Sequence, residues 1–420
     1  MENTSAFVCS IPNAGDIFQK KSRKKTIDSK TDVAGNGTGI HPKPMKVLHI
    51  GADNVGFGGR SVIAFNLTQM MDESRVRNDF LVFHEITQQE YIDALKKKKS
   101  KYVEIHINSR LPKLIRKIKR TLTMAHVMKV EEYDLIHIHA DHAYEAMCNI
   151  GAGKLAGINR FVIHAHTTGG DSKFSKLKKQ IILKCQRRLS KENYLQLACS
   201  DEAAEYFFGR KNKNNTIILK NGIDIKKFIY HSDSKLEIRK KLGYKEQLIV
   251  GNIGRFSPQK NHFFILDVFA EILNRSPSAR LMLIGDGELR TDVENAAKRK
   301  GIYESVDFLG NRNDVPDLLQ AMDVFLLPSL YEGFGIVNLE AQCTGLPCVV
   351  STEVPRMVKV TDLVQFIPLS EAPDVWADAV CKKADIAVRK SRETELIRAG
   401  YDITASAAQL QKLYEDIGRI

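Results

Sequence analysis

The sequence predicts an α/β protein made of two doubly wound, Rossmann-like domains that face a central cleft. Its 420 residues are more than one hydrophobic core ordinarily holds, so two domains are expected. Two successive series of short apolar runs alternate with segments of helical periodicity, a pattern typical of parallel sheets covered by helices on both faces. The composition, 43% hydrophobic and 27% charged, is that of a globular protein and argues against a fibrous or generally disordered chain.

The first series begins at Met45 and predicts an N-terminal domain over residues 45–220. Residues 1–44 are expected to be a disordered extension or a segment added by an upstream start codon. They are polar, rich in Gly, Ser, Thr and Asn, and contain a basic run at 20–25. The strands expected in this domain are residues 46–50, 80–83, 102–105, 135–138, 161–164 and 195–198.

The second series predicts a C-terminal domain over residues 221–403, in which residues 221–247 contain the hinge. The strands expected here are residues 248–251, 281–284, 306–309, 324–327 and 347–350. In doubly wound sheets, ligands bind outside the carboxyl ends of the strands. We therefore expect the functional residues at those ends, facing the cleft.

The segment from Glu332 to Glu340 carries the most specific functional signal. Gly333 and Gly335 remove side chains where a ligand approaches the backbone, and the helix that follows offers N–H groups and a positive dipole end to an anion. The Glu340 carboxylate can accept hydrogen bonds from two ribose hydroxyls, and Glu332 lies within reach of sugar hydroxyls. The alternative is a turn whose glycines serve only packing, and the two flanking glutamates argue against it.

Two basic residues follow the first strand of the second series. The forked guanidinium of Arg255 and the mobile ammonium of Lys260 suit a diphosphate, whose two phosphates are both charged. The alternative for this pair is a solvated basic surface.

These motifs resemble those of glycosyltransferase family 4, retaining enzymes with the GT-B architecture of two Rossmann-like domains. The resemblance covers nearly all of residues 216–352. It rests on Asn221-Gly222-Ile223-Asp224, Gly254-Arg255 with Lys260-Asn261, Leu283-Ile284-Gly285-Asp286-Gly287, Phe308-Leu309-Gly310, and Glu332 with Glu340. Weaker similarities at 79–82, 198–200 and 364–369 point to enzymes of capsular, exopolysaccharide or O-antigen assembly.

The resemblance implies a role for each matching residue. Arg255 and Lys260 neutralise the donor diphosphate, Glu340 binds the ribose, and Glu332 binds the sugar. The other donor-binding positions that it implies are Gly310, Asn311 and Arg312 beside the base, and Gly333, Phe334, Gly335 and Ile336 around the sugar and distal phosphate. It also implies that the last helix, residues 404–420, packs back on the N-terminal domain.

A glycine-rich turn at 56–59 follows the first strand of the first series. It resembles a dinucleotide-binding turn, but the G-x-G-x-x-G form is absent and no acidic residue follows at the expected distance. In family 4 the glycines that match Gly58 and Gly59 leave room for the donor phosphate beside the backbone. The sequence departs from the family at Arg60-Ser61, which leaves the acceptor contacts of this loop open.

His166 ends a strand of the first series and matches the active-site histidine of the family, so it is expected to be catalytic together with Glu332, Arg255 and Lys260. His137, His139 and His164 are expected to be packing residues. A zinc site formed by these histidines is the alternative, and it lacks a matching carboxylate or thiol set.

No metal and no cofactor are expected. The sequence contains no Asp-x-Asp pair, which metal-dependent transferases of the other common fold use to hold a divalent ion. Arg255, Lys260 and a helix N-terminus supply positive charge instead. Seven scattered cysteines without a C-x-x-C pair indicate reduced thiols in a cytoplasmic protein.

The net charge of +13 arises in the first half of the chain, which suggests an anionic partner for that half. Residues 172–191 contain eight Lys or Arg and no acid, and residues 110–128 are similar. Both segments carry an apolar helical stripe, so they are expected to rest on anionic lipid at the inner face of the cell membrane. The alternative is a core-facing stripe with a solvated lysine face. A lipid-linked glycan acceptor follows from the first interpretation.

We therefore predict a retaining, metal-independent glycosyltransferase that uses a nucleotide-diphosphate sugar, with UDP as the expected nucleotide, and binds no nucleic acid. One alternative is a nucleotide-sugar epimerase or oxidoreductase, but no tyrosine is followed by lysine four residues later. Another is a non-catalytic basic protein that binds membrane or nucleic acid, which leaves Glu332 and Glu340 unexplained.

Overall fold

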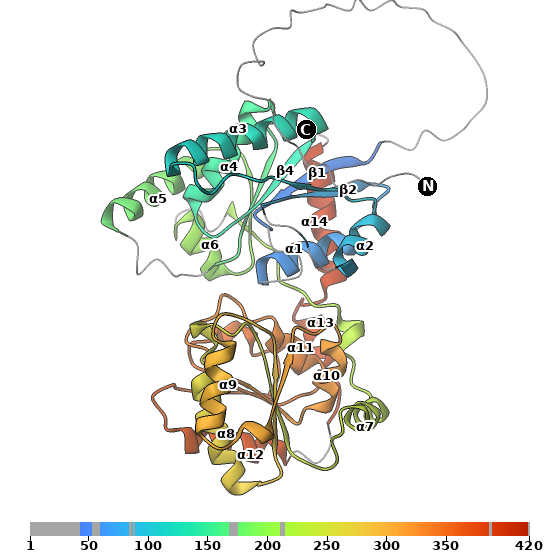
Figure 1. The fold of residues 1–420 in the computed structure, drawn as a ribbon. Coiled ribbons are helices and arrows are strands. Elements are labelled where there is room, and N and C mark those ends of the chain that lie inside the picture. Colours follow the sequence, from blue (N-terminus) through green and yellow to red (C-terminus); the bar gives the residue numbers. More distant parts are fainter. Residues whose placement is uncertain are drawn as a thin grey trace, which may run out of the picture. The chain divides into compact units, whose positions relative to one another are not determined.

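The computed structural model describes residues 43–52, 59–83, 86, 89–167, 175–210, 215–385 and 389–418. Residues 1–42 of the expected extension, and Gly58, lie outside these ranges. The described residues form two parallel sheets flanked by helices (Figure 1). This arrangement confirms the predicted α/β class with two doubly wound, Rossmann-like sheets.

The first sheet has seven strands in the order β3-β2-β1-β4-β5-β6-β7. The strands are β1 (Met45–Ile50), β2 (Val76–Val82), β3 (Tyr102–Glu104), β4 (Leu135–Ala140), β5 (Phe161–Ala165), β6 (Leu195–Ala198) and β7 (Ile217–Ile218). The helices are α1 (Gly59–Gln69), α2 (Gln89–Lys97), α3 (Lys113–Glu131), α4 (Ala143–Leu155), α5 (Lys176–Leu189) and α6 (Asp201–Phe208). The strand order reverses between β1 and β4, which pair directly, and a doubly wound sheet binds its ligands at such a point.

The second sheet has six strands in the order β10-β9-β8-β11-β12-β13. The strands are β8 (Ile249–Ile253), β9 (Arg280–Ile284), β10 (Val306–Gly310), β11 (Val324–Leu327), β12 (Cys348–Ser351) and β13 (Val364–Ile367). The helices that follow along the chain are α7 (Ser232–Lys241), α8 (His262–Arg275), α9 (Arg290–Arg299), α10 (Val315–Ala321), α11 (Val337–Cys343), α12 (Pro373–Ala384), α13 (Glu393–Arg398) and α14 (Ile403–Gly418), whose end contacts the first sheet. The order reverses between β8 and β11.

Helices cover both faces of the second sheet, which explains why its central strand β11 is apolar throughout. Alternate residues of β11 point to opposite faces: Phe325 and Leu327 pack with α10 and α11, whereas Val324 and Leu326 pack with α8, α9 and α12. Both β8 and β11 contribute buried side chains to the two cores, so packing on both faces positions the loops that follow these strands.

The described residues fall into two compact units. One contains the residues up to 140, residues 145–163 and the chain end from 414, and the other contains residues 141–144 and 164–413. Within the first unit, the Tyr414 hydroxyl bonds to His137 and Glu415 pairs with Arg75. These contacts attach the end of α14 to β4 and to the start of β2. The boundaries at 220 and 403 stay predictions.

Three elements of the structure were not predicted, and β2 begins four residues earlier than expected. Strand β7 has only two residues, and the exposed Gln365 interrupts the apolar pattern of β13, so neither was predicted. Helix α7 lies in the expected hinge and has almost no apolar face. It is held instead by Arg239 and Lys235, which both pair with Asp323 beside β11.

Candidate active site

Two loops meet at the carboxyl ends of β8 and β11, because these strands are direct neighbours. The Leu330 N–H donates to the Gln259 carbonyl at 2.8 Å, and the Asn261 amide donates to the Pro328 carbonyl at 3.2 Å. These bonds tie the loop that contains Lys260 to the loop that contains Glu332.

Lys260 and Glu332 form an ion pair across these loops. The Lys260 ammonium lies 2.6 Å from a Glu332 carboxylate oxygen, and the side chains are only 15% and 5% exposed. The Ser329 hydroxyl donates to the same carboxylate oxygen at 2.7 Å, and the Gln259 amide donates to the other at 3.3 Å. The structure thus brings together two residues that the sequence analysis assigned to different parts of a donor.

Arg255 lies on the same loop, but it is 72% exposed and pairs with Glu288 at 3.1 Å. Glu288 follows β9 and was not predicted as a site residue. The two loops approach closely because of glycine: a Cβ at Gly285 would lie 2.2 Å from the Gly254 carbonyl oxygen, and one at Gly287 would lie 2.5 Å from that of Phe256. The glycines of the Gly-Asp-Gly motif therefore allow the loop of Glu288 to reach Arg255.

The predicted turn and helix after β11 are present. Gly335 has a φ of +74°, which favours glycine, and α11 begins at Val337. The Phe334 ring is buried and lies 5.8 Å from the Tyr401 ring, so only the backbone of Phe334 is suited to ligand contact. The half-buried Ile336 packs against the same core.

Glu340 lies in the first turn of α11. Burial raises the pKa of its carboxyl from 4.5 to about 7. A carboxylate in such surroundings is stabilised by ligand hydroxyls that donate hydrogen bonds to it.

The predicted base loop follows β10. Gly310 has a φ of +66°, and its carbonyl accepts a bond from the Gly285 N–H at 2.8 Å. The Arg312 guanidinium pairs with Asp314. Arg290, which was not predicted, lies beside Gly310 and donates to the Phe308 carbonyl at 3.2 Å.

His166 directly follows β5 and is 8% exposed, and its ring centroid lies 4.1 Å from that of His164. It therefore lies at the carboxyl end of its strand, as expected. Of the predicted glycine pair, Gly59 is the first residue of α1. Arg60, where the sequence departs from the family, lies 3.8 Å from Glu145.

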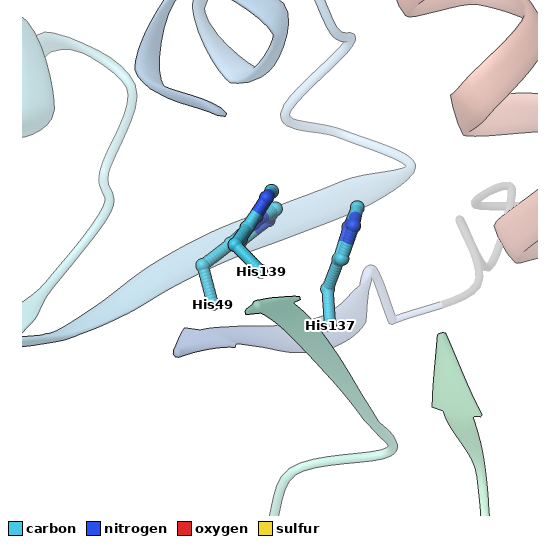
Figure 2. A group of neighbouring side chains, drawn as sticks. All are labelled: His49, His137 and His139. Carbon is cyan, nitrogen blue, oxygen red and sulfur yellow. The ribbon is translucent and has the colours of Figure 1, made fainter. Parts of the chain in front are cut away.

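Three further histidines, His49 on β1 and His137 and His139 on β4, project from one face of the first sheet (Figure 2). All three are buried, and their candidate metal-binding nitrogens lie within 4.8 Å of one another. His49 Nδ1 is 3.0 Å from His139 Nε2, with ring centroids 5.3 Å apart and planes inclined by 19°. The rings thus meet edge to edge in nearly one plane, which is the geometry of an N–H···N hydrogen bond.

The partner of His49 Nε2 defines the direction of this bond. Nε2 lies 3.0 Å from the Asn78 amide oxygen, so it carries the proton and donates. Burial lowers the pKa of His49 to about 4, which keeps the ring neutral and makes Nδ1 an acceptor. His139 Nε2 must then donate to His49 Nδ1. A metal ion would need both nitrogens deprotonated and about 2.0–2.1 Å from it, so this geometry fits a hydrogen-bonded packing cluster better than a zinc site.

The basic helices present apolar side chains to solvent. On α3, Leu114, Ile115, Ile118 and Leu122 are between 51% and 70% exposed, and the buried side begins at Thr123. On α5, Leu177 and Ile181 are exposed, whereas Ile182 and Leu189 are buried. A core-facing stripe at 114–122 is therefore wrong, and on α5 the apolar residues are divided between exposed and buried positions. Among the described helices, none is both long and apolar enough to cross a membrane.

Comparisons with known proteins agree with this geometry. The sequence model of Glycosyl transferases group 1 matches residues 234–382. The putative glycosyltransferase EpsF of Bacillus subtilis is 31% identical over 385 residues, which cover 89% of this chain and 97% of EpsF. A galactosyltransferase of Escherichia coli is 34% identical over a region that covers 57% of this chain and 62% of the galactosyltransferase. Its name specifies UDP-Gal and an α-D-GlcNAc-diphosphoundecaprenol acceptor.

Solved structures show the same fold. HepE of Anabaena, solved in complex with UDP and glucose, matches with a TM-score of 0.70 at 19% identity and covers 88% of this chain and 99% of its own. WaaG, a glycosyltransferase involved in lipopolysaccharide biosynthesis, matches with a TM-score of 0.62 at 15% identity. The match covers 87% of this chain and 99% of the WaaG chain.

Two Rossmann-like parallel sheets, with the Glu332-to-Glu340 turn and the Lys260 loop at adjacent strand ends, define the GT-B class of glycosyltransferases. Within that class, the chain belongs to the group 1 glycosyltransferases, as the resemblance to family 4 predicted. The protein is thus a glycosyltransferase, and this assignment disfavours the epimerase, oxidoreductase and non-catalytic alternatives.

Proposed function

We propose that this glycosyltransferase transfers a sugar from a UDP-linked donor to a glycan or polyprenyl-linked acceptor in the biosynthesis of a surface polysaccharide. The observation that carries the proposal is the position of Arg255, Lys260 and Glu332 on the two adjoining loops at the carboxyl ends of β8 and β11. Further support comes from relatives whose names specify a UDP sugar and a diphosphoundecaprenol acceptor, or Vi polysaccharide biosynthesis.

In the proposed reaction, the bond between the anomeric carbon and the donor diphosphate breaks, and the acceptor oxygen bonds to the same face with retention. Negative charge develops on the leaving diphosphate, where Arg255, Lys260 and the backbone around Gly335 stabilise it electrostatically. The leaving phosphate accepts the acceptor proton. These positive groups take the place of a metal ion, and we propose that the reaction requires none.

The remaining predicted residues divide between the two ends of the donor. Glu340 holds the ribose, and Gly310, Asn311 and Arg312 lie beside the base. His166 acts at the sugar, where its imidazole donates to a hydroxyl or supports the positive charge that develops at the anomeric carbon.

The acceptor half is proposed to contact the inner face of the cell membrane through α3. The helix exposes Leu114, Ile118 and Leu122 at intervals of four residues, and basic side chains flank this stripe. Exposed apolar side chains gain free energy by entering lipid, and each nearby cation adds about 1 kcal/mol on an anionic surface. The protein then acts as a peripheral cytoplasmic enzyme.

Slow hydrolysis of a panel of sugar nucleotides, with water as the acceptor, tests the donor assignment. We expect one or more UDP sugars to be hydrolysed, and GDP, ADP or TDP sugars to be used less well. A folded protein that binds and hydrolyses none of them, or that co-purifies with tightly bound NAD, would contradict the proposal.

A further inference from the structure

The ion pair between Lys260 and Glu332 joins two groups that the proposed reaction assigns to different parts of the donor. Lys260 is to hold the diphosphate, whereas Glu332 is to accept hydrogen bonds from sugar hydroxyls. Each is the partner of the other at 2.6 Å, and both are largely buried. A carboxylate repels a diphosphate bound beside it, so donor binding favours a rearrangement of this pair.

The surroundings of Glu332 show what the rearrangement leaves behind. When Lys260 turns away, Glu332 keeps the Ser329 hydroxyl on one oxygen and the Gln259 amide on the other. It then lacks one charge-assisted hydrogen bond, which a sugar hydroxyl can replace. The Lys260 stem runs along Gly254, where a Cβ would lie 2.9 Å from Cε, so glycine leaves room for the stem beside the loop backbone.

We propose that the Lys260–Glu332 pair is a release latch, an inference that rests on the proposed donor chemistry. Glu332 holds Lys260 until an intact donor binds, and then exchanges Lys260 for a sugar hydroxyl while Lys260 moves to the diphosphate. After transfer the sugar no longer contacts Glu332. The ion pair between Glu332 and Lys260 therefore forms again. Because Lys260 then binds the nucleoside diphosphate less strongly, the diphosphate is released more readily.

The latch predicts opposite effects of Glu332 on donor and product. Glu332→Gln removes the competitor for Lys260 at nearly constant shape, so UDP should bind about tenfold more tightly, the scale for one hydrogen bond to a charged group. The affinity for a UDP sugar should rise much less, because that ligand also loses its carboxylate contact. The ratio of the two dissociation constants is the measured quantity.

Two controls separate the latch from a general loss of negative charge. Glu288→Gln removes a carboxylate that pairs with Arg255, but this pair is exposed, so UDP affinity should rise by less than about threefold. In a Lys260→Met background, Glu332→Gln should give no gain, because there is no ammonium to release.

Isothermal titration calorimetry with UDP, and with UDP-glucose and UDP-galactose, performs the test. Tighter UDP binding by the Glu332 variant that disappears without Lys260 supports the latch. Unchanged or weaker UDP binding by that variant, or an equal gain from Glu288→Gln, overturns the latch and leaves the proposed function in place. A folded wild-type protein that binds none of these ligands overturns both.

Discussion

Glu340 links a perturbed pKa to donor binding. Burial raises the pKa of its carboxyl to about 7, so at neutral pH the group is roughly half protonated. An ionised carboxylate accepts hydrogen bonds on both oxygens, whereas the protonated form has less acceptor capacity and adds a donor. Because ribose hydroxyls are to donate to this group, nucleotide binding favours the ionised form.

The affinity for UDP should therefore increase with pH. If only the protein with ionised Glu340 binds UDP, the fraction of the protein that can bind rises about tenfold between pH 6 and pH 8. Since the terminal phosphate of UDP also titrates near pH 6, the matched control is Glu340→Gln, which retains only the phosphate titration. Calorimetric titrations at several pH values compare the two proteins. If UDP affinity depended on pH equally in the wild-type protein and in Glu340→Gln, or if their UDP affinities were equal at pH 8, the assignment of Glu340 to the ribose would be refuted.

The same pKa shift predicts an opposite effect on stability. A carboxyl whose pKa is raised by folding stabilises the protein below its unfolded pKa of about 4.5, and this stabilisation is lost as the pH rises through about 7. At pH 8 the ionised group costs up to about 3 kcal/mol of unfolding free energy. Glu340→Gln should then be the more stable protein. Urea unfolding followed by the fluorescence of Trp376, the only tryptophan and fully buried, measures this, and a less stable variant would contradict the reasoning.

Three further predictions follow from the site and from α3. Replacing Arg255 or Lys260 by Ala should lower turnover by about a hundredfold or more, and activity should persist in EDTA. If magnesium or manganese restored activity that EDTA had abolished, metal independence would be wrong. His166→Ala should lower turnover far more than UDP affinity, whereas a lower melting temperature with normal activity per folded molecule would make His166 a packing residue. Replacing Ile118 and Leu122 by Ser should weaken binding to anionic phospholipid vesicles at least about tenfold without changing UDP affinity, and unchanged vesicle binding would argue against contact through α3.

The sequence was sufficient to predict the elements of the fold wherever apolar runs were long. Most expected strands lie within a residue or two of their observed positions, because the buried strands of a parallel sheet are apolar on both faces. Strand β13 was missed because Gln365 breaks that pattern, and α7 was missed because ion pairs to Asp323 hold it rather than an apolar face.

The candidate site was predictable as a set of residues but not as a set of contacts. Glu332 and Lys260 are 72 positions apart, and only the direct pairing of β8 with β11 brings their loops together. Glu288 had no sequence signal of its own, although the Gly-Asp-Gly motif before it marks the close approach of two loops. The exposure of the apolar stripe on α3 also required the structure, since periodicity alone does not say which face is buried.

The most direct test of the proposed function is the configuration of the sugar that the purified protein first releases from a UDP α-sugar in the presence of EDTA. Proton NMR distinguishes the anomers before they interconvert. We predict that the α-anomer appears first, which would support the donor, retention and metal independence in one experiment. Initial release of the β-anomer, or hydrolysis that occurs only when a divalent metal is restored, would contradict the proposed mechanism.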